Sequence, residues 1–329
     1  MTQEKVLALL KAGPEAYHSG QSMSRALGVS RAAVWKAVEC LRNEGYWIDS
    51  VPNRGYCLKA EPDLLRAGAL SNELEGCRVG GTLVCLPTVD STNNELKRRA
   101  AEAPDGLAVL ADEQTGGRGR RGKSFQSPRG QGIYLSVLLR PDCPLAELSA
   151  LTAWIAVAVC EGIREACGAE AEIKWTNDVL LGGKKLCGIL TELEIEAESG
   201  LLRHVIAGIG VNVGQTAEDF GPELSPVATS LALAMGHTVR RTELAACLLR
   251  ALDRMYAAFP TEKERYLAEY RRRCVTTGRN VLLLRGDARR PAFAEAVEDD
   301  FSLRVLFPDG HRESITAGEV SVRGQMGYI

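Results

Sequence analysis

One glycine- and arginine-rich segment, residues 117–124, constrains the fold more than any other feature of the sequence. It matches two phosphate-binding patterns at once, GxGxxG of dinucleotide-binding folds and GxxxxGK(S/T) of P-loop proteins. In both folds a helix starts directly at the loop, because the amides of the helix N-terminus bind the phosphate. The residues that follow, FQSPRGQG, contain a proline and two glycines and do not sustain a helix. The sequence therefore excludes both folds.

The wider segment, residues 114–130, is called the glycine-rich loop below. It carries five basic side chains, five glycines and no acidic residue. Glycine lets the backbone approach a phosphate closely, and arginine offers paired donors to its oxygens. We predict an anion-binding loop that is mobile when empty, because its charges repel one another. The alternative is a basic loop that is only solvated, although loops of this length in compact domains are usually functional.

Predicted strands and helices alternate between residues 64 and 275. Gly182 and Gly183 predict a hairpin turn, so the sheet is mixed rather than doubly wound and parallel. The predicted strands are residues 82–86, 107–112, 133–139, 172–175, 179–181, 186–192 and 205–213. The predicted helices are residues 93–103, 145–167, 244–258 and 263–273. From residue 280 onward, short strands separated by turns predict a small antiparallel barrel.

Two polar clusters lie where these strands end. The sequence KWTND, residues 174–178, precedes the hairpin, and Lys185 lies on the return strand, so the hairpin brings a lysine near an Asn/Asp pair. A lysine on such an apolar strand is costly unless it meets an anion. The alternative is a strand-end lysine on a solvated face.

The second cluster is DSTNNE, residues 90–95, at the start of a predicted helix. Thr92 and Glu95 fit a capping box. Capping leaves Ser91 and Asn93 as polar groups at a helix start that follows a strand. We expect capping and ligand binding to coexist here.

Residues 1–60 predict three short helices and a hairpin. The helices end at residue 13, at residue 27 and at residue 44, and Ser30 offers an N-cap to the third. Two strands, residues 48–51 and 56–58, flank the turn PNRG. This order is that of a winged helix-turn-helix, although a three-helix bundle without a DNA role shows a similar pattern.

Charge favours DNA binding by this segment. Residues 1–60 hold 8 basic and 5 acidic side chains, whereas the whole chain has a net charge of −2. We expect Arg42 on the outward face of the third helix. The residues predicted to contact DNA are Ser30, Arg31, Ala32, Trp35, Lys36 and Arg54.

Composition excludes several other classes. The 329 residues predict two or three domains. Ten cysteines without a CxxC pair and four dispersed histidines argue for reduced core thiols and against a structural metal. No uncharged apolar run reaches the length of a membrane span, and no secretory signal precedes the first helix. We predict a cytoplasmic protein without a membrane partner.

Taken together, these motifs resemble the biotin protein ligases, in the bifunctional form that is also a biotin operon repressor. The resemblance rests on residues 90–93, 114–122, 174–178, 185–190, 208–212 and 318–323, together with the winged helix-turn-helix. Two positions depart from the family pattern: Thr176 stands where proline is usual, and Phe125 stands where tryptophan is usual. Phenylalanine still offers a π-face for the adenine that tryptophan is expected to stack on.

The resemblance implies an α+β chain with three parts. These are an N-terminal winged helix-turn-helix (residues 1–62), a central mixed-sheet α/β ligase domain (63–276) and a small C-terminal SH3-like β-barrel (277–329). It also implies the following site residues. Catalysis is expected from Lys185, Arg118, Arg120 and Asp178. Biotin is expected to contact Ser91, Thr92, Asn93, Gln114, Arg118, Gly119, Arg120 and Lys185, and ATP or the adenylate to contact Arg121, Phe125, Asn177, Asn212 and Arg323.

The implied reaction is ATP-dependent and AMP-forming: biotin becomes biotinyl-5′-AMP and then passes to a lysine of a carrier protein. The implied cofactors are ATP and Mg²⁺, with Asp178 a possible Mg²⁺ ligand. The implied partners are the biotin carboxyl carrier protein of acetyl-CoA carboxylase, operator DNA and a second copy of the chain in a ligand-promoted dimer. Two alternatives stay open: a ligand-sensing regulator with a degenerate enzyme domain, and a lipoate or octanoate ligase, whose relatives lack the GRGRRG loop.

Overall fold

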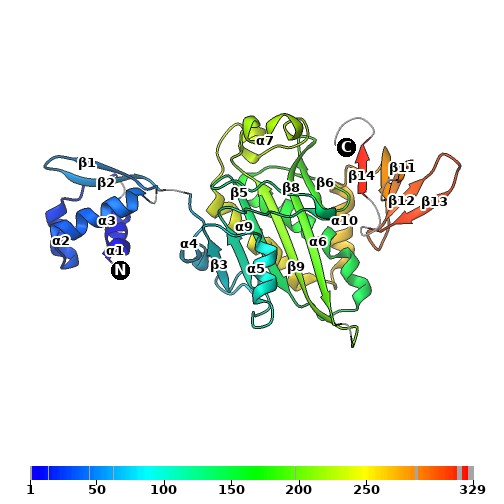
Figure 1. Cartoon of the computed structure of the whole chain (residues 1–329), viewed down its shortest axis with the longest axis horizontal. Helices are drawn as coiled ribbons and strands as arrows, with labels where there is room; N and C mark the ends of the chain where they lie inside the picture. The colour runs from blue at the N-terminus through cyan, green and yellow to red at the C-terminus, as the bar shows by residue number, and fades with distance from the viewer. Residues whose placement is uncertain are drawn as a thin grey trace. The chain divides into compact units, whose positions relative to one another are not determined.

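The computed structural model describes most of the chain. It covers residues 2–13, 15–43, 45–61, 63–196, 198–285, 288–316 and, for the backbone alone, 321–324. The chain divides into two compact units, Met1–Asp63 and Leu64–Ile329, coloured from blue to red along the chain in Figure 1. The three-domain division expected from the sequence stays a prediction.

The first unit consists of three helices and a two-stranded hairpin. The helices are α1 (Thr2–Ala12), α2 (Gly20–Leu27) and α3 (Arg31–Asn43). The antiparallel strands are β1 (Trp47–Val51) and β2 (Gly55–Ala60). The helix-turn-helix and its hairpin wing are therefore confirmed.

Local signals explain these boundaries. The Ser30 hydroxyl accepts a hydrogen bond from the backbone N–H of Ala33 at 3.1 Å, so Ser30 caps α3 as the sequence predicts. Gly28 ends α2 with φ of +66°, a left-handed conformation that favours glycine. Val34 and Val38 are fully buried in the core of this unit.

The second unit is built on a seven-stranded sheet of order β3-β4-β5-β9-β8-β7-β6. Its strands are β3 (Leu83–Leu86), β4 (Ala108–Ala111), β5 (Gly132–Leu139), β6 (Glu172–Lys174), β7 (Asp178–Leu181), β8 (Lys184–Ile195) and β9 (Leu202–Asn212). Only β3 and β4 run parallel among these described pairs, and the other pairs are antiparallel. The predicted mixed sheet and the β7–β8 hairpin are confirmed.

Helices cover the two faces of this sheet unequally, as Figure 1 shows. On one face α6 (Leu151–Cys167) and α9 (Arg241–Ala258) pack together, with α10 (Lys263–Arg273) beside α6. On the other face α5 (Thr92–Arg99) packs on β4, β5 and β9 through a small core that includes Leu96.

The stretch Leu145–Cys167 begins as a 3-10 helix, η3 (Leu145–Ala150), and continues as α6. Among the described residues it is the one helical stretch long and apolar enough to cross a membrane. Of its most apolar window, 72% is buried inside the protein. Burial of this kind is that of a core helix.

Five short elements were not expected from the sequence. They are α4 (Ala67–Ser71), η1 (Asn72–Leu74), η2 (Arg120–Gly122), α7 (Ala217–Leu224) and α8 (Leu231–Met235). Gly221, with φ of +67°, and Pro222 interrupt α7, so no sustained helical pattern marks it in the sequence. The predicted helix 93–103 is also shorter, since α5 ends at Arg99.

A five-stranded antiparallel sheet of order β13-β12-β11-β10-β14 follows α10. Its strands are β10 (Arg279–Arg285), β11 (Ala288–Val297), β12 (Leu303–Leu306), β13 (Arg312–Ile315) and β14 (Ser321–Gly324). In the described residues no pairing joins β13 to β14, so the closed barrel expected from the sequence is not found. The sheet is tied to the rest of the unit where the Trp175 indole N–H donates to the Phe301 carbonyl at 2.9 Å.

Candidate active site

Three strand residues near α5 are glycines and carry no side chain. Gly188 of β8 pairs with Gly210 of β9, and Gly208 lies two residues before Gly210 on the same strand. A Cβ atom on Gly208 would lie 2.3 Å from Asn93 Oδ1, and one on Gly210 would lie 2.6 Å from the Phe125 ring. Asn93 and Phe125 therefore lie directly against backbone, and these glycines form the floor of a site.

A pocket opens over this glycine floor. All eight residues expected to bind biotin line it, together with Phe125 and Asn177 from the set expected to bind ATP. The lining consists of Ser91, Thr92, Asn93, Gln114, Arg118, Gly119, Arg120, Phe125, Leu135, Asn177, Lys185, Gly188, Ile189, Leu190, Gly208, Ile209 and Gly210. The fold thus gathers segments that are more than a hundred residues apart in the chain.

Connected hydrogen bonds hold the polar groups at the start of α5. The backbone N–H and the hydroxyl of Thr92 donate to Gln114 Oε1 at 2.9 and 3.1 Å, and Gln114 Nε2 donates to Ser127 Oγ at 2.8 Å. The buried Ser136 hydroxyl lies 2.7 Å from Thr92 Oγ1 and 2.6 Å from Asn93 Oδ1. These side chains are fixed before any ligand arrives, which lowers the entropic cost of binding.

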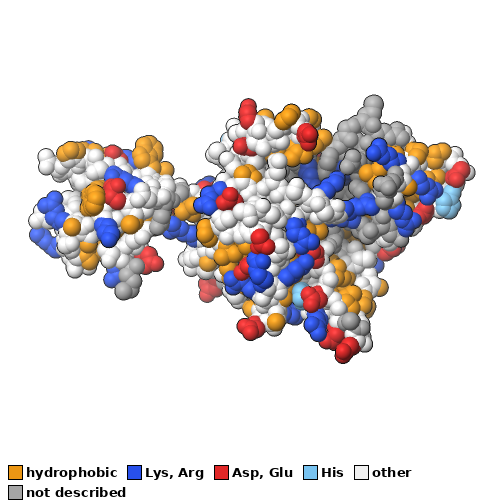
Figure 2. Space-filling view, in the orientation of Figure 1, with side chains coloured by type: hydrophobic (Ala, Val, Ile, Leu, Met, Phe, Trp, Pro, Cys, Tyr) orange, Lys and Arg blue, Asp and Glu red, His pale blue; other side chains and the backbone are white. Residues whose placement is uncertain are grey.

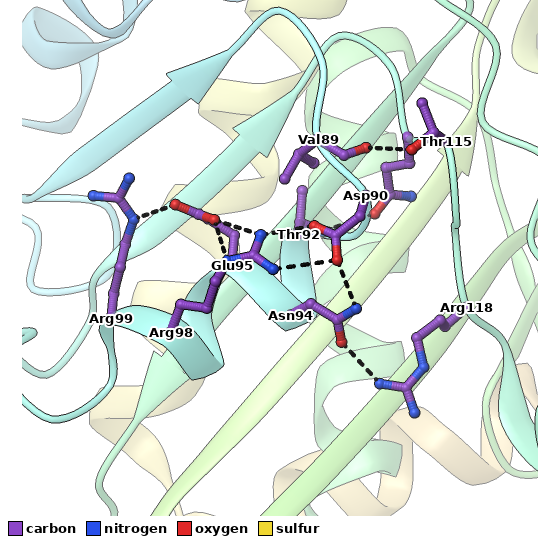
Figure 3. Close-up of polar contacts among 10 residues, drawn as sticks. Val89, Asp90, Thr92, Asn94, Glu95, Arg98, Arg99, Thr115 and Arg118 are labelled. Atoms are coloured by element: carbon purple, nitrogen blue, oxygen red, sulfur yellow. Dashed lines mark hydrogen bonds and ion pairs between the residues drawn. The ribbon is translucent and has the colours of Figure 1, made fainter.

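The capping box expected at this helix start is wrong. Ser91, not Thr92, is the N-cap residue, and its side chain makes no capping hydrogen bond. Thr92 is the first helical residue, and its hydroxyl is used on Gln114. Glu95 instead pairs with Arg98 and Arg99, each at 2.6 Å (Figure 3).

A β-bulge directs Lys185 into the site. Asp178 pairs with Gly188, but Leu180 pairs with Lys185, so Leu186 is one extra residue on β8. The bulge turns Lys185 to the same face as Asp178, and its Nζ lies 2.6 Å from Asp178 Oδ1. The expectation that this lysine meets the Asn/Asp pair is confirmed.

Arg120 supplies a second cation close to the same carboxylate. Its Nη1 donates to Asn177 Oδ1 at 2.9 Å, and Asn177 Nδ2 donates to the Ile189 carbonyl at 3.0 Å. Burial lowers the pKa of the Arg120 guanidinium, and the nearby charge of Asp178 acts against that shift. A partly buried guanidinium next to a lysine makes this end of the pocket suited to an anion.

The other expected site residues lie at the margins or outside the pocket. Arg121 donates to the Leu284 carbonyl of β10 at 2.9 Å, and Asn212 Nδ2 donates to the Thr229 carbonyl at 3.1 Å. Arg323 is part of β14, but its side chain lies outside the described residues. The segment 318–320 of the last motif also lies outside them.

Sequence reasoning missed several residues that shape the site. The glycine floor has a signal in the sequence, since glycines at 208 and 210 of one strand leave one face bare. Ser136 is an interior strand residue that nothing in the pattern distinguishes. Asn94 and Glu192, which bond to Arg118 across the chain, also carry no local signal.

The chemistry of the donors limits a metal ion at this site. In the described part of the chain, no group of three or more His, Cys, Asp or Glu side chains is placed to hold a metal. Mg²⁺ is often held by one or two carboxylates together with substrate phosphates. Asp178 is a carboxylate of that kind, so a nucleotide-bound Mg²⁺ fits here and a cage made by the protein alone does not.

A second candidate surface lies on the first unit. Arg31, Ala32 and Trp35 of α3 face Asn53 of the wing across a groove, and the Trp35 side chain is 57% exposed. Ser30, Lys36 and Arg54 are exposed too. Figure 2 shows basic side chains, in blue, on the visible face of this unit.

Two arginines of this unit have intramolecular contacts. The Arg54 guanidinium lies 4.4 Å from the centre of the Tyr17 ring, which supports the wing tip. Arg42, expected on the outward face, instead donates to the Ile48 carbonyl at 2.7 and 3.0 Å and to Glu39. That expectation was wrong, because the guanidinium of Arg42 joins α3 to β1.

Comparisons with known proteins find matches in both units of the chain. Residues 85–212 match the Biotin/lipoate A/B protein ligase family, and residues 2–57 match an HTH domain. The chain is 42% identical over 252 residues to the "Bifunctional ligase/repressor BirA" of Bacillus subtilis strain 168, covering 76% of this chain and 77% of that protein. It is 32% identical over 321 residues to the protein of the same name from Escherichia coli K12, covering 97% and 96%.

A solved structure is similar as well. The biotin protein ligase from Aquifex aeolicus in complex with biotin and ATP is 29% identical, with a TM-score of 0.64, and covers 74% of this chain and 99% of that chain. Both units of the chain thus have relatives in proteins of one kind.

Proposed function

The chain belongs to the family of bifunctional biotin ligases and repressors, and from this premise we propose that it activates biotin with ATP, transfers it to a carrier protein and binds operator DNA. One observation carries the proposal: a single pocket gathers eight residues expected for biotin, and its lysine, Lys185, lies 2.6 Å from Asp178. Family membership and the pocket lining point to the same reaction.

We propose that biotin lies on the glycine floor. Gly208 and Gly210 carry no side chains of their own and line the same pocket as Asn93 and Phe125, which suits the flat bicyclic ring of biotin. Its ureido group offers N–H donors and a carbonyl acceptor, which suit the fixed polar groups of Thr92, Asn93 and Gln114. Its carboxylate then points toward the cations at the other end of the pocket.

In the first half-reaction the biotin carboxylate attacks the α-phosphate of ATP, a P–O bond to the β-phosphate breaks, and pyrophosphate leaves. Two anions must meet, so positioned cations lower the barrier. Lys185 and Arg120 lie close together beside Asp178 and are proposed to stabilise the charge that develops between carboxyl and phosphate. Lys185 acts as an electrostatic stabiliser and not as a nucleophile, because an acyl-lysine would be a stable amide.

In the second half-reaction the amine of an acceptor lysine attacks the acyl carbon, and AMP leaves. Biotinyl-5′-AMP reacts with water, so the glycine-rich loop is proposed to cover it until the acceptor arrives. Gly119 and Phe125 of this loop line the pocket. Phe125 is proposed to stack on the adenine, with Arg121, Asn177, Asn212 and Arg323 completing the nucleotide site.

Mg²⁺ is proposed to enter with the nucleotide. Asp178 would hold it together with phosphate oxygens, and the ion would neutralise part of the triphosphate charge. Asp178 Oδ1 lies 2.6 Å from Lys185 Nζ, so this end of the pocket already holds carboxylate oxygens of the kind that Mg²⁺ prefers.

Further proposals concern the oligomeric state of the protein, its cellular location and acceptor, and its C-terminal sheet. A single winged helix makes few phosphate contacts, so we propose a ligand-promoted homodimer that adds the contacts of two copies on operator DNA. The chain is proposed to act in the cytoplasm, with the biotin carboxyl carrier protein of acetyl-CoA carboxylase as its acceptor. The C-terminal antiparallel sheet is proposed to be an SH3-like barrel.

One experiment tests the enzymatic proposal. Purified protein is incubated with biotin, α-labelled ATP and a biotin carboxyl carrier domain, and AMP and the biotinylated carrier are measured. We expect both products in equal amounts. No release of AMP or pyrophosphate favours a regulator that only senses its ligand, and preferred use of lipoate or octanoate favours a ligase of the lipoate type.

A further inference from the structure

Arg118 ties the glycine-rich loop to two elements outside it. Its Nη1 donates to Asn94 Oδ1 of α5 at 3.1 Å (Figure 3) and lies 3.2 Å from Glu192 Oε1 of β8. The Arg118 side chain therefore reaches across the start of α5 toward a neutral and an anionic acceptor. Both acceptors belong to regular secondary structure, Asn94 to α5 and Glu192 to β8.

Asp90 fixes the orientation of the Asn94 amide. Asn94 Nδ2 donates to Asp90 Oδ2 at 2.9 Å, which turns the amide oxygen toward Arg118. Asp90 is held in turn by Arg98, whose Nη2 lies 2.7 Å from Asp90 Oδ1, as Figure 3 shows. Hydrogen bonds from Arg98 and Asn94 hold the pKa of Asp90 well below its ordinary value, so this carboxylate stays ionised at neutral pH.

Glu192 connects the pocket to the loop. Asn93 Nδ2 donates to Glu192 Oε2 at 2.8 Å, and Lys97 Nζ donates to Oε1 at 2.7 Å. Burial alone raises the pKa of Glu192, but the bonds from Lys97 and Asn93 and the charge of Arg118 outweigh burial and lower it. One carboxylate thus orients an asparagine of the pocket and holds an arginine of its cover.

We propose that Asn94 and Glu192 are positioning residues of the ligase: they fasten Arg118 and so keep the glycine-rich loop closed over the activated biotin. This inference rests on the proposed function and adds to it. Biotin carboxylate and ATP bring several negative charges to the five cations of the loop, but the adenylate keeps only one phosphate charge once pyrophosphate has left. The anions that favour closure are therefore lost at the moment when the labile intermediate must be covered. The carboxylate of Glu192 belongs to the protein and stays.

The test measures how long the adenylate is retained. Enzyme is loaded with labelled biotin and ATP, excess unlabelled biotin is added, and bound label is followed with time for wild type, Glu192→Gln and Asn94→Ala. We expect about 3- to 10-fold faster loss in each variant, the size of effect typical of partly exposed ion pairs and hydrogen bonds to charged groups. Pyrophosphate formation in the first turnover should stay within about twofold, a split that general loss of structure does not produce.

Glu194→Gln is the matched control. Glu194 lies two residues further along β8, on the same face as Glu192, and its carboxylate is 3.6 Å from His204. This variant should retain the adenylate as wild type does. In an Arg118→Gln background, the further change Glu192→Gln should not speed the loss of adenylate any more, because glutamine still offers an acceptor oxygen to Asn93 and the ion pair with Arg118 is already gone.

The outcomes separate two failures. If wild type forms pyrophosphate while Glu192→Gln and Asn94→Ala retain the adenylate as wild type does, or if the Arg118 and Glu192 changes are additive, the fastening role is overturned. A wild type that forms no pyrophosphate overturns the proposed function and this inference with it.

Discussion

The two recognition surfaces of this protein are built in opposite ways. The groove on the first unit comes from the starts of α2 and α3 and from the adjoining hairpin, within residues 19–56. The pocket on the second unit combines residues from Ser91 to Gly210, carried by α5, the glycine-rich loop and the β8 and β9 strands. The first surface depends on local structure, and the second depends on the register of a sheet.

The two surfaces also differ in whether their basic side chains are paired with acidic side chains. On the groove proposed to bind DNA, Arg31 and Trp35 are exposed to solvent. In the pocket, the cations already meet anions of the protein, since Lys185 pairs with Asp178 and Arg118 with Glu192. Figure 2 shows acidic and basic side chains side by side on the visible face of the second unit. A site that holds reactive anions must balance its cations when empty, whereas a DNA-binding face need not.

The largest expected effect separates the two surfaces completely. Deleting residues 1–62 should abolish operator binding, because the first unit carries the whole groove. Adenylate formation should remain within a few-fold of wild type. Gel shift and pyrophosphate release measure the two outcomes, and DNA binding by the truncated protein would contradict the assignment of the groove.

Lys185→Ala should lower the rate of pyrophosphate formation by about 10² to 10³, because removing one positioned transition-state donor costs about 3–4 kcal/mol. Operator binding by the unliganded protein should be unchanged. The control is Lys184→Ala, since the neighbouring amine donates to the Ser225 carbonyl outside the pocket. A rate within a few-fold of wild type would remove Lys185 from the reaction.

Gly210→Ala tests the glycine floor. The new methyl group would lie 2.6 Å from the Phe125 ring, so the ring must move. Overpacking of this kind typically costs 1–3 kcal/mol, and we expect about tenfold weaker biotin binding by calorimetry. Gly68→Ala is the control, because no atom lies within 4 Å of its added Cβ. Unchanged affinity would show that biotin does not use this floor.

Two arginines of the first unit are expected to have different roles, one in DNA binding and one in stability. Arg31→Ala should weaken operator binding about fivefold and reduce the salt-dependence slope by about one, as for a lost phosphate contact. Arg42→Ala should lower the melting temperature of this unit, because its bonds to the Ile48 carbonyl are lost, but should leave the salt slope unchanged. Equal slopes for both variants would contradict the division between these residues.

The smallest expected effect is a pH dependence. The pKa of Asp90 is lowered in the folded state by hydrogen bonds from Arg98 and Asn94, so its ionised form stabilises the fold above the unfolded value of about 3.9. That contribution is lost as the pH falls through the folded value, and it is below about 1 kcal/mol because the pair is exposed. Denaturant unfolding of wild type and Asp90→Asn should differ at pH 7, and the difference should shrink progressively as the pH falls below the unfolded value. A constant difference would exclude this linkage.

Short-range signals explain what was predictable. The cap at Ser30 and the turn at Gly182 and Gly183 act within a few residues, so the sequence predicts them correctly. The absence of a helix after the glycine-rich loop is decided locally too. At the start of α5, the local capping pattern gave way to a bond from Thr92 to Gln114, 22 residues away.

The sequence by itself determined the winged helix-turn-helix, the mixed sheet and the set of polar residues that line the pocket. Only the tertiary structure decided which way those residues point and what they meet. The bulge at Leu186 turns Lys185 toward Asp178, and sheet register brings Glu192 within reach of Asn93, 99 residues earlier. Propensity and periodicity act over a few residues, whereas each of these contacts depends on strand pairing across the whole unit.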